Sequence, residues 1–232
     1  SIIQFGTFFI IFILAGCAPN DAPKLASTPE VTASTPSETS LPDEIVPSPT
    51  ADTAPSASES IEVTYFTPSQ GEGPYYIVDK PEDHDNDLTQ FAGAQGSPDG
   101  EVIEFSGIVF DDSGNPVPKV VIEIWQTDSN GVYNHPGDPQ TSLRDSNFQF
   151  YGEAVTTDDG AYNFRTILPG QYEPRPRHIH VKVKFDGKVI LTTQFYFKGD
   201  ADLDDELMLA QLGGEGQHLI ISLEEGMDSE GN

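Results

Sequence analysis

The strongest constraint on the fold is a series of short β-branched and aromatic runs that begins at Val102, each bounded by glycine, proline, asparagine or aspartate. Such runs predict β-strands, here at 102–110, 119–127, 152–156, 161–166, 178–185, 188–197 and 217–223. Only 202–212 has the pattern of a helix. Many short strands with little helix between them predict an all-β domain, a β-sandwich of mixed or antiparallel sheets with long loops.

Two turn signals, DDG at 158–160 and DG at 186–187, predict β-hairpins. On the run at 178–185, successive side chains point to opposite faces, so His178 and His180 share one face and Ile179, Val181 and Val183 can pack on the other. Two adjacent imidazoles can bind a metal. For an isolated His-x-His, however, a polar strand edge whose histidines face water is the commoner structure.

Composition divides the chain into three parts. Residues 1–16 are nearly all apolar, and Leu14-Ala15-Gly16-Cys17 resembles the bacterial lipobox, so 1–17 is predicted to be a lipoprotein-type signal with Cys17 as the lipidation site. An uncleaved membrane anchor is the competing interpretation. Residues 18–60 are rich in Ser, Thr, Pro and acidic residues and predict a disordered linker. Residues 61–232 are predicted to form the folded domain.

The charge of the chain restricts its partners. With 38 acidic and 11 basic residues, the formal net charge is -27, which opposes binding to phosphate backbones and anionic lipid headgroups. Nucleic acid is therefore not an expected partner. Membrane association is expected only through the N-terminal lipid, on a protein exported to the bacterial cell envelope or beyond it. A homo-oligomer is compatible with the sequence.

A metal site at the histidine pair needs further ligands, because stable sites usually draw three or four from the protein. Tyr172 lies in the loop just before the histidine run, and Tyr133 follows the run at 119–127 across a glycine turn. A phenol has a reference pKa near 10, so it ionises at neutral pH only beside strong positive charge. Ferric iron could supply that charge.

Four blocks of the sequence resemble the intradiol ring-cleavage dioxygenases, the family of catechol 1,2-dioxygenase and protocatechuate 3,4-dioxygenase. They are GEGPYY at 71–76, PVPKVVIEIWQTDSNGVYNH at 116–135, DDGAYNFRTILPGQYEPRPRHIHVKV at 158–183 and TQFYFKGD at 193–200. The resemblance implies a non-haem Fe(III) held by two tyrosines and two histidines. By position within the motifs, Tyr133 matches the equatorial tyrosine, Tyr172 the axial one, and His178 and His180 the histidine pair.

The resemblance also implies a reaction, in which a small aromatic diol is cleaved by O2 between its two hydroxylated carbons to a cis,cis-muconate-type product. Tyr172 would leave the iron and accept a substrate proton. Arg175 would contact the substrate and stabilise negative charge, and Gln194 matches a second active-site polar residue. Tyr75 is a candidate for lining the substrate pocket.

Some residues depart from the family pattern: Arg177 stands where proline or alanine is common, Pro174 where an aromatic is frequent, and Ala201 where proline is frequent. By alternation, Arg177 should face away from the iron. Two other functions remain open. One is a non-catalytic β-sandwich binding module at the cell surface, and the other is a zinc hydrolase built on the histidine pair.

Overall fold

The computed structural model describes residues 13–15, 61–203, 212 and 214–225. The predicted linker at 18–60, the predicted lipidation site Cys17 and most of the predicted helix at 202–212 lie outside these ranges. None of the helical segments described reaches the length and hydrophobicity needed to cross a lipid bilayer. The described ranges include two short 3-10 helices, η1 (Thr141–Leu143) and η2 (Gly214–Leu219).

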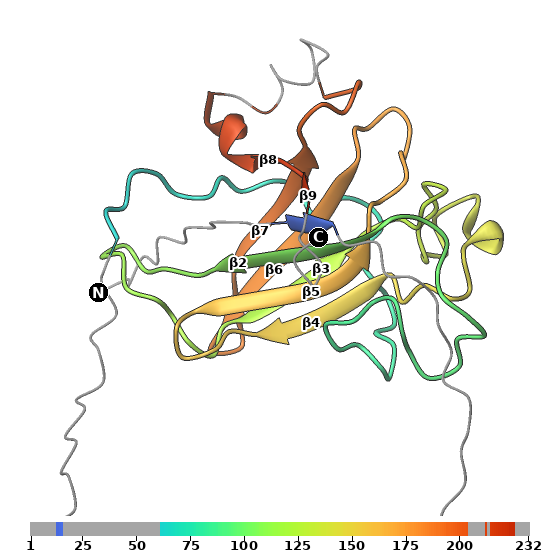
Figure 1. Cartoon of the computed structure of the whole chain (residues 1–232), viewed down its shortest axis with the longest axis horizontal. Helices are drawn as coiled ribbons and strands as arrows, with labels where there is room; N and C mark the ends of the chain where they lie inside the picture. The colour runs from blue at the N-terminus through green and yellow to red at the C-terminus, as the bar shows by residue number, and fades with distance from the viewer. Residues whose placement is uncertain (1–12, 16–60, 204–211, 213, 226–232) are drawn as a thin grey trace, which may run out of the picture. The chain divides into compact units, whose positions relative to one another are not determined.

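The strands form two sheets (Figure 1). The five-stranded sheet has the order β4-β3-β6-β7-β8, comprising β4 (Tyr151–Val155), β3 (Val121–Trp125), β6 (His178–Phe185), β7 (Lys188–Phe197) and β8 (Ile220–Ile221). The four-stranded sheet has the order β5-β2-β1-β9, comprising β5 (Ala161–Ile167), β2 (Val102–Ile108), β1 (Ile13–Ala15) and β9 (Glu224–Glu225). The β7–β8 and β1–β9 pairs are parallel and the others antiparallel. The prediction of an all-β sandwich with mixed sheets is confirmed.

One apolar core joins the two sheets. It takes alternate side chains from both, including Phe105 and Phe164 from the four-stranded sheet and Ile122, Val181 and Phe195 from the five-stranded sheet. All five are at most 1% exposed. The predicted alternation along β6 is confirmed, because Ile179, Val181 and Val183 lie in this core and the two histidines lie on the opposite face.

The two turn signals have different outcomes. Asp186 (φ 49) and Gly187 (φ 72) both have positive φ and join the paired strands β6 and β7, so this hairpin is confirmed. The hairpin predicted at 158–160 is wrong, because that turn links β4 in one sheet to β5 in the other. Turn residues specify a local reversal, and they do not specify which sheet the next strand joins.

The strand predicted at 217–223 is also partly wrong. Residues 217–219 belong to η2, and only Ile220 and Ile221 pair with β7, opposite Tyr196 and Phe197. Because 217–219 are coiled in η2, and β7 ends at Phe197 opposite Ile221, only these two residues form a ladder. The apolar composition of the segment instead buries Leu219 in the core.

Candidate metal centre

Three side-chain atoms converge on the outer face of the five-stranded sheet. Tyr133 Oη, His178 Nε2 and His180 Nε2 are each 3.1 Å from the other two. Protein ligands that share one ion at about 2.1 Å lie about 3 Å apart. The three residues are 3 to 5% exposed, so the interpretation of His178 and His180 as water-facing residues of a strand edge is wrong.

Tyr133 is brought to the histidines by a loop that two aspartates hold together. Asp128 Oδ1 accepts hydrogen bonds from the backbone N–H groups of Asn130 and Val132, and Asp138 Oδ2 accepts one from Tyr133. Gly131 has a φ of 81°, and a Cβ there would lie 1.9 Å from the carbonyl oxygen of Gln171. The Tyr133 loop therefore packs directly on the backbone that leads to Tyr172.

Both histidines are in the neutral state that binding a cation requires. His178 Nδ1 lies 2.7 Å from the carbonyl oxygen of Pro176 and donates to it, which leaves Nε2 free to act as a ligand. Burial lowers the pKa of His178 to about 4 and the pKa of His180 well below its ordinary value, and burial raises the pKa of Tyr133. At neutral pH the imidazoles are thus uncharged and able to bind a cation, whereas Tyr133 stays a phenol until a bound cation lowers its pKa. Its phenolate would then be a hard oxygen ligand that suits ferric iron.

His180 is held by an aromatic ring and a glycine. The Trp125 indole stacks on its imidazole at 4.6 Å with an interplanar angle of 8°, since the two residues are paired in register across β3 and β6. On another side, a Cβ at Gly73 would lie 3.3 Å from His180 Cε1. His180 Nδ1 is buried and has no hydrogen-bond partner, so the direction of this ring is fixed by packing and by the contacts of Nε2 with Tyr133 and His178.

The fourth predicted ligand lies beside the other three. Tyr172 Oη is hydrogen-bonded to Tyr75 Oη at 3.0 Å, and its ring meets the Tyr133 ring edge-on at 5.7 Å. The hydrogen bond to Tyr172, with burial, raises the pKa of Tyr75 to about 12. His135 also lies beside Tyr75, with the ring centroids 5.4 Å apart. The structure therefore groups Tyr133, His178 and His180 and places Tyr172 and Tyr75 next to them.

Arg175 and Gln194 are also brought together, with a tyrosine that the sequence analysis missed. Arg175 Nη2 donates to Gln194 Oε1 and to Tyr196 Oη, both at 3.0 Å, and Tyr196 Oη donates to Gln194 Oε1. Arg175 Nε is buried without a partner. Alternation along β7 puts Tyr196 on the same face as Gln194 and opposite His178 in register, which was the available signal. Arg177 is exposed and faces Asp200 at 3.8 Å.

The family of the chain follows from comparison with known proteins. The sequence model of a family described as Dioxygenase matches residues 71–231, more than half of the chain, and this region includes every residue of the candidate centre. The chain belongs to the intradiol ring-cleavage dioxygenase family.

Its relatives and solved structural neighbours agree with this family. The protocatechuate 3,4-dioxygenase beta chain of Burkholderia cepacia is 39% identical over 50% of this chain and 53% of its own. The catechol 1,2-dioxygenase of Acinetobacter baylyi is 31% identical over 68% of this chain and 54% of its own. The chain thus spans about half the length of these curated relatives. The structure of catechol 1,2-dioxygenase from an Acinetobacter species, inhibited by bound mercury, has a TM-score of 0.53 at 30% identity and covers 71% of this chain and 56% of that chain.

The candidate metal centre can reach three or more donors only if tyrosine is one of them. Among the described residues, no group of three His, Cys, Asp or Glu side chains is arranged to hold a metal ion. Zinc sites in hydrolases are usually completed by such groups. The donor set of two imidazoles and nearby phenols therefore disfavours the zinc hydrolase interpretation.

We expect the metal-free dioxygenase domain to lose stability as the pH falls from about 6.5 to about 4. In this window the folded state keeps His178 neutral and the unfolded chain binds a proton, so unfolding takes up protons and acid favours it. The slope is about 1.4 kcal/mol per pH unit for one histidine. Urea unfolding at several pH values measures it, and the His178→Gln variant should show a shallower slope. Equal slopes would contradict a neutral, buried His178.

Proposed function

We propose that this family member is a non-haem Fe(III) enzyme that cleaves a small aromatic diol with O2 between its two hydroxylated carbons, giving a cis,cis-muconate-type product. The observation that carries the proposal is the triangle of Tyr133 Oη, His178 Nε2 and His180 Nε2, with edges of 3.1 Å. Family membership supports it. Tyr172, whose ring centroid lies 5.7 Å from that of Tyr133, is the proposed fourth ligand.

Each residue of the centre has a proposed task. When bound, ferric iron would act as a Lewis acid. It would lower the pKa of its phenol ligands and of the diol hydroxyls, and it would make the diol reactive toward O2. Tyr172 accepts a substrate proton at Oη, and the Tyr75 hydroxyl, 3.0 Å away, then holds the neutral phenol. Tyr133, His178 and His180 are proposed to stay in place, because all three are buried and contact one another.

Arg175 is proposed to stabilise the negative charge that develops on the ring during cleavage. Its Nη2 is already engaged by Gln194 and Tyr196, which fixes the guanidinium plane. Its Nε–H is buried without a partner and is the donor available to a substrate oxygen. A fixed donor in a water-poor site stabilises such charge without reorganisation.

We expect uncharged diols to be preferred over carboxylated ones. The three cations in or beside the centre already have partners: Arg175 binds Gln194 and Tyr196, Arg177 binds Asp200, and Lys182 binds Glu72. A substrate carboxylate would have to displace one of these contacts or take the Arg175 Nε–H, which is proposed to bind an oxygen of the reacting diol. Oxygen uptake with catechol and with a carboxylated catechol measures the preference, and kcat/KM should be at least about tenfold higher for catechol, equivalent to about 1.4 kcal/mol. A preference for the carboxylated diol would contradict this prediction.

The colour of the iron-loaded protein tests the function as a whole. Tyrosinate bound to Fe(III) should make the protein red-brown, and the colour should accompany oxygen uptake with a diol. A folded, iron-replete and colourless protein would contradict the proposal. Colour without oxygen uptake across a panel of diols would support the rival function, a non-catalytic binding module.

We further propose that the protein is exported and lipid-anchored through Cys17, with 18–60 as the tether to the folded domain. The support is the sequence Leu14-Ala15-Gly16-Cys17 after an apolar run. Cleavage before Cys17 would remove β1, which pairs with β2 and β9. A labelled fatty acid should appear on the wild-type protein and be absent from the Cys17→Ala variant; equal labelling of both would refute lipidation at this residue.

A further inference from the structure

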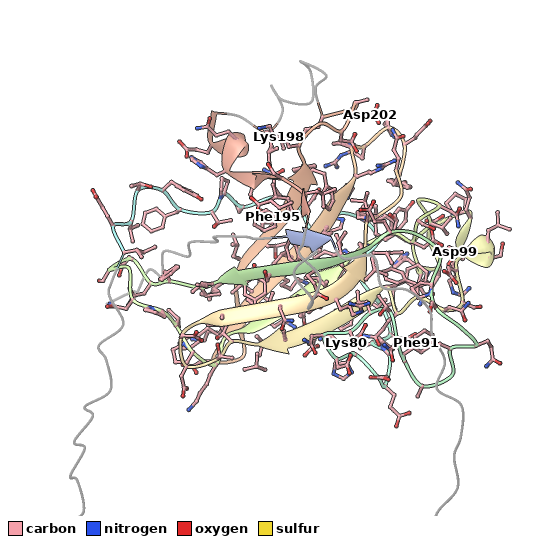
Figure 2. The ribbon with its side chains drawn as sticks, in the orientation of Figure 1. Lys80, Phe91, Asp99, Phe195, Lys198 and Asp202 are labelled. Atoms are coloured by element: carbon pink, nitrogen blue, oxygen red, sulfur yellow. The ribbon has the colours of Figure 1, made fainter. Side chains whose placement is uncertain are left out.

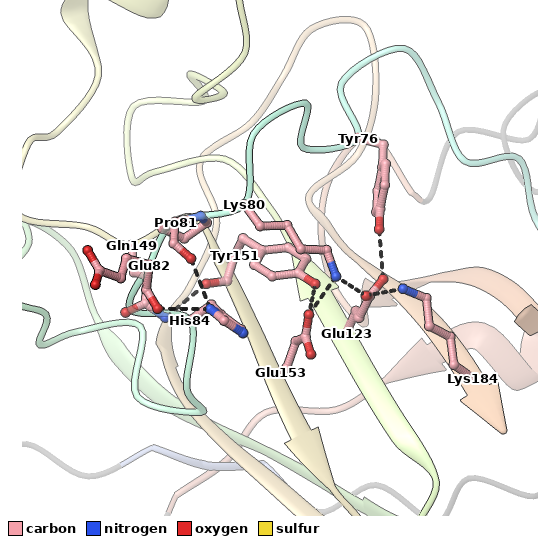
Figure 3. A network of polar contacts seen from close by, with 10 residues as sticks. All are labelled: Tyr76, Lys80, Pro81, Glu82, His84, Glu123, Gln149, Tyr151, Glu153 and Lys184. Atoms are coloured by element: carbon pink, nitrogen blue, oxygen red, sulfur yellow. Dashed lines mark hydrogen bonds and ion pairs between the residues drawn. The ribbon is translucent and has the colours of Figure 1, made fainter. Parts of the chain in front are cut away.

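Glu123 of β3 has a buried carboxylate and lies two residues before Trp125, which pairs with His180. Its side chain is 0% exposed and accepts hydrogen bonds from Tyr76 Oη at 2.9 Å, from Lys80 Nζ at 2.5 Å and from Lys184 Nζ (Figure 3). Lys80 also binds Glu153 at 2.6 Å. The sequence analysis assigned no role to Glu123, Lys80, Lys184 or Glu153.

Two of the groups that bind Glu123 come from one segment, 71–80, which we call the strap. It belongs to no helix or strand. Its carbonyl at Gly71 accepts a hydrogen bond from Gln194 at 2.6 Å, and Glu72 binds Lys182 at 2.6 Å. The strap therefore lies across the outer face of the five-stranded sheet and is held there by side chains of the sheet.

The first half of the strap covers the metal ligands. Gly73 packs on the ring of His180, with the position of a Cβ 3.3 Å from Cε1, and Tyr75 binds the hydroxyl of Tyr172 at 3.0 Å. Directly after these contacts, Tyr76 reaches Glu123. In sequence order, Gly73 and Tyr75, which cover the ligands, are therefore followed by Tyr76 and Lys80, which bind Glu123.

The registers of the strands link Glu123 to His180. Glu123 is paired with Lys182, and Trp125 is paired with His180 two residues along each strand. The Lys182 ammonium lies 3.2 Å from the centroid of the Tyr76 ring, and Tyr76 meets the Trp125 indole edge-on at 4.9 Å. Tyr76 thus contacts the indole that stacks on His180.

Among the described residues, the charged side chains that join Glu123, the strap and their ion-pair partners are equal in number and opposite in sign. Three carboxylates, Glu72, Glu123 and Glu153, meet three ammonium groups, Lys80, Lys182 and Lys184. Hydrogen bonds from Lys184 and Lys80 lower the pKa of Glu123 to about 2 against the opposing effect of burial, so it is ionised at neutral pH. Apolar residues could fill the same space at lower desolvation cost, which suggests that the charges specify position rather than add stability.

We propose that Glu123 is a positioning residue for the metal centre: its carboxylate, by binding Tyr76 and Lys80 together, holds the strap against His180 and Tyr172. The inference rests on the proposed metal site for its functional meaning. The seating of the strap, however, is testable in the metal-free protein, so the two proposals can fail separately.

The test is the Glu123→Gln variant, which keeps the shape of the side chain and removes its charge. Trp125 is the only tryptophan of the chain and contacts both Tyr76 and His180, so its fluorescence reports on the strap. In the metal-free variant we expect red-shifted emission and faster quenching by acrylamide. Iron affinity should fall about 10- to 100-fold, as is typical when a residue that orients metal ligands is changed.

Two further variants keep the test decisive. Glu104→Gln removes the carboxylate partner of Arg165 on the other sheet, an ion pair at 3.2 Å, and should leave both fluorescence and iron affinity unchanged. Tyr76→Phe removes one strap contact and leaves Glu123 bound to both lysines, so it should fold even if Glu123→Gln does not, and it should shift the emission and weaken iron binding in the same direction.

The outcomes separate cleanly. A folded Glu123→Gln protein with wild-type emission, quenching and iron affinity would overturn the inference. So would altered fluorescence with unchanged iron affinity, because the strap would then be held without positioning the ligands. A wild-type protein that binds no iron would overturn the proposed function, whereas the fluorescence would still decide how the strap is held.

Discussion

Replacing His178 with alanine is expected to abolish iron binding, and with it the red-brown absorption and all oxygen uptake. The substitution removes one of three donor atoms that lie 3.1 Å from one another and leaves only Tyr133 and His180 in the triangle. With Tyr172 as the proposed fourth ligand, the variant keeps a single imidazole and two phenols, and we expect this incomplete set to release the iron. Iron content per folded protein, measured by atomic emission, and the visible spectrum give the result.

The matched control for this prediction is His218→Ala. His218 stacks on Tyr65 with ring centroids 3.7 Å apart and makes no contact with the triangle, so this variant should keep its iron and colour. Circular dichroism must show that both variants are folded. A folded His178→Ala protein with full iron content and unchanged colour would refute the placement of the metal.

Replacing Arg175 with glutamine is expected to lower kcat by about 10²- to 10³-fold, the usual cost of removing one donor that stabilises developing negative charge. Iron content and colour should persist, because Arg175 makes no hydrogen bond to the three triangle atoms and instead orients Gln194 and Tyr196. Oxygen uptake with catechol at saturating concentration measures the loss. A fall in iron content of the same size would mean that Arg175 supports metal binding rather than the reaction.

Arg177→Gln is the control, since it makes the same chemical change two residues away. Arg177 is exposed and its partner is Asp200 at 3.8 Å, so kcat should stay close to the wild-type value. Equal losses in the two variants would remove the distinction between the buried and the exposed arginine. The comparison also tests whether the departure from the family pattern at Arg177 affects the reaction.

Local sequence was sufficient for the strands that carry the centre. The alternation HIHVKV predicted that His178 and His180 share a face, and the Asp186-Gly187 turn predicted the hairpin that brings Gln194 into register with His180. These features depend on the period of two along a strand and on the backbone freedom of the turn residues. Both are properties of neighbouring residues, so the sequence determined them.

Local sequence was not sufficient where distant segments meet. The water-facing interpretation of the histidines was wrong because the strap at 71–80, about a hundred residues earlier, covers their face. The turn at 158–160 was assigned to a hairpin because its residues fit one equally well, whereas the packing of two sheets sends β5 to the other layer. Tyr196 was missed because only register with β6 reveals its neighbours.

The sequence by itself therefore determined the all-β class and the faces of β6, because both follow from residue identity and strand periodicity, whereas the set of two tyrosines and two histidines was implied by the resemblance to the family. Only the tertiary structure decided that two imidazoles and a phenol meet at 3.1 Å, that Tyr172 binds Tyr75, and that Glu123 holds the strap over them. Apart from the contact between the two histidines, those contacts join residues 43 to 97 positions apart. They form only when burial of the shared core brings the segments together.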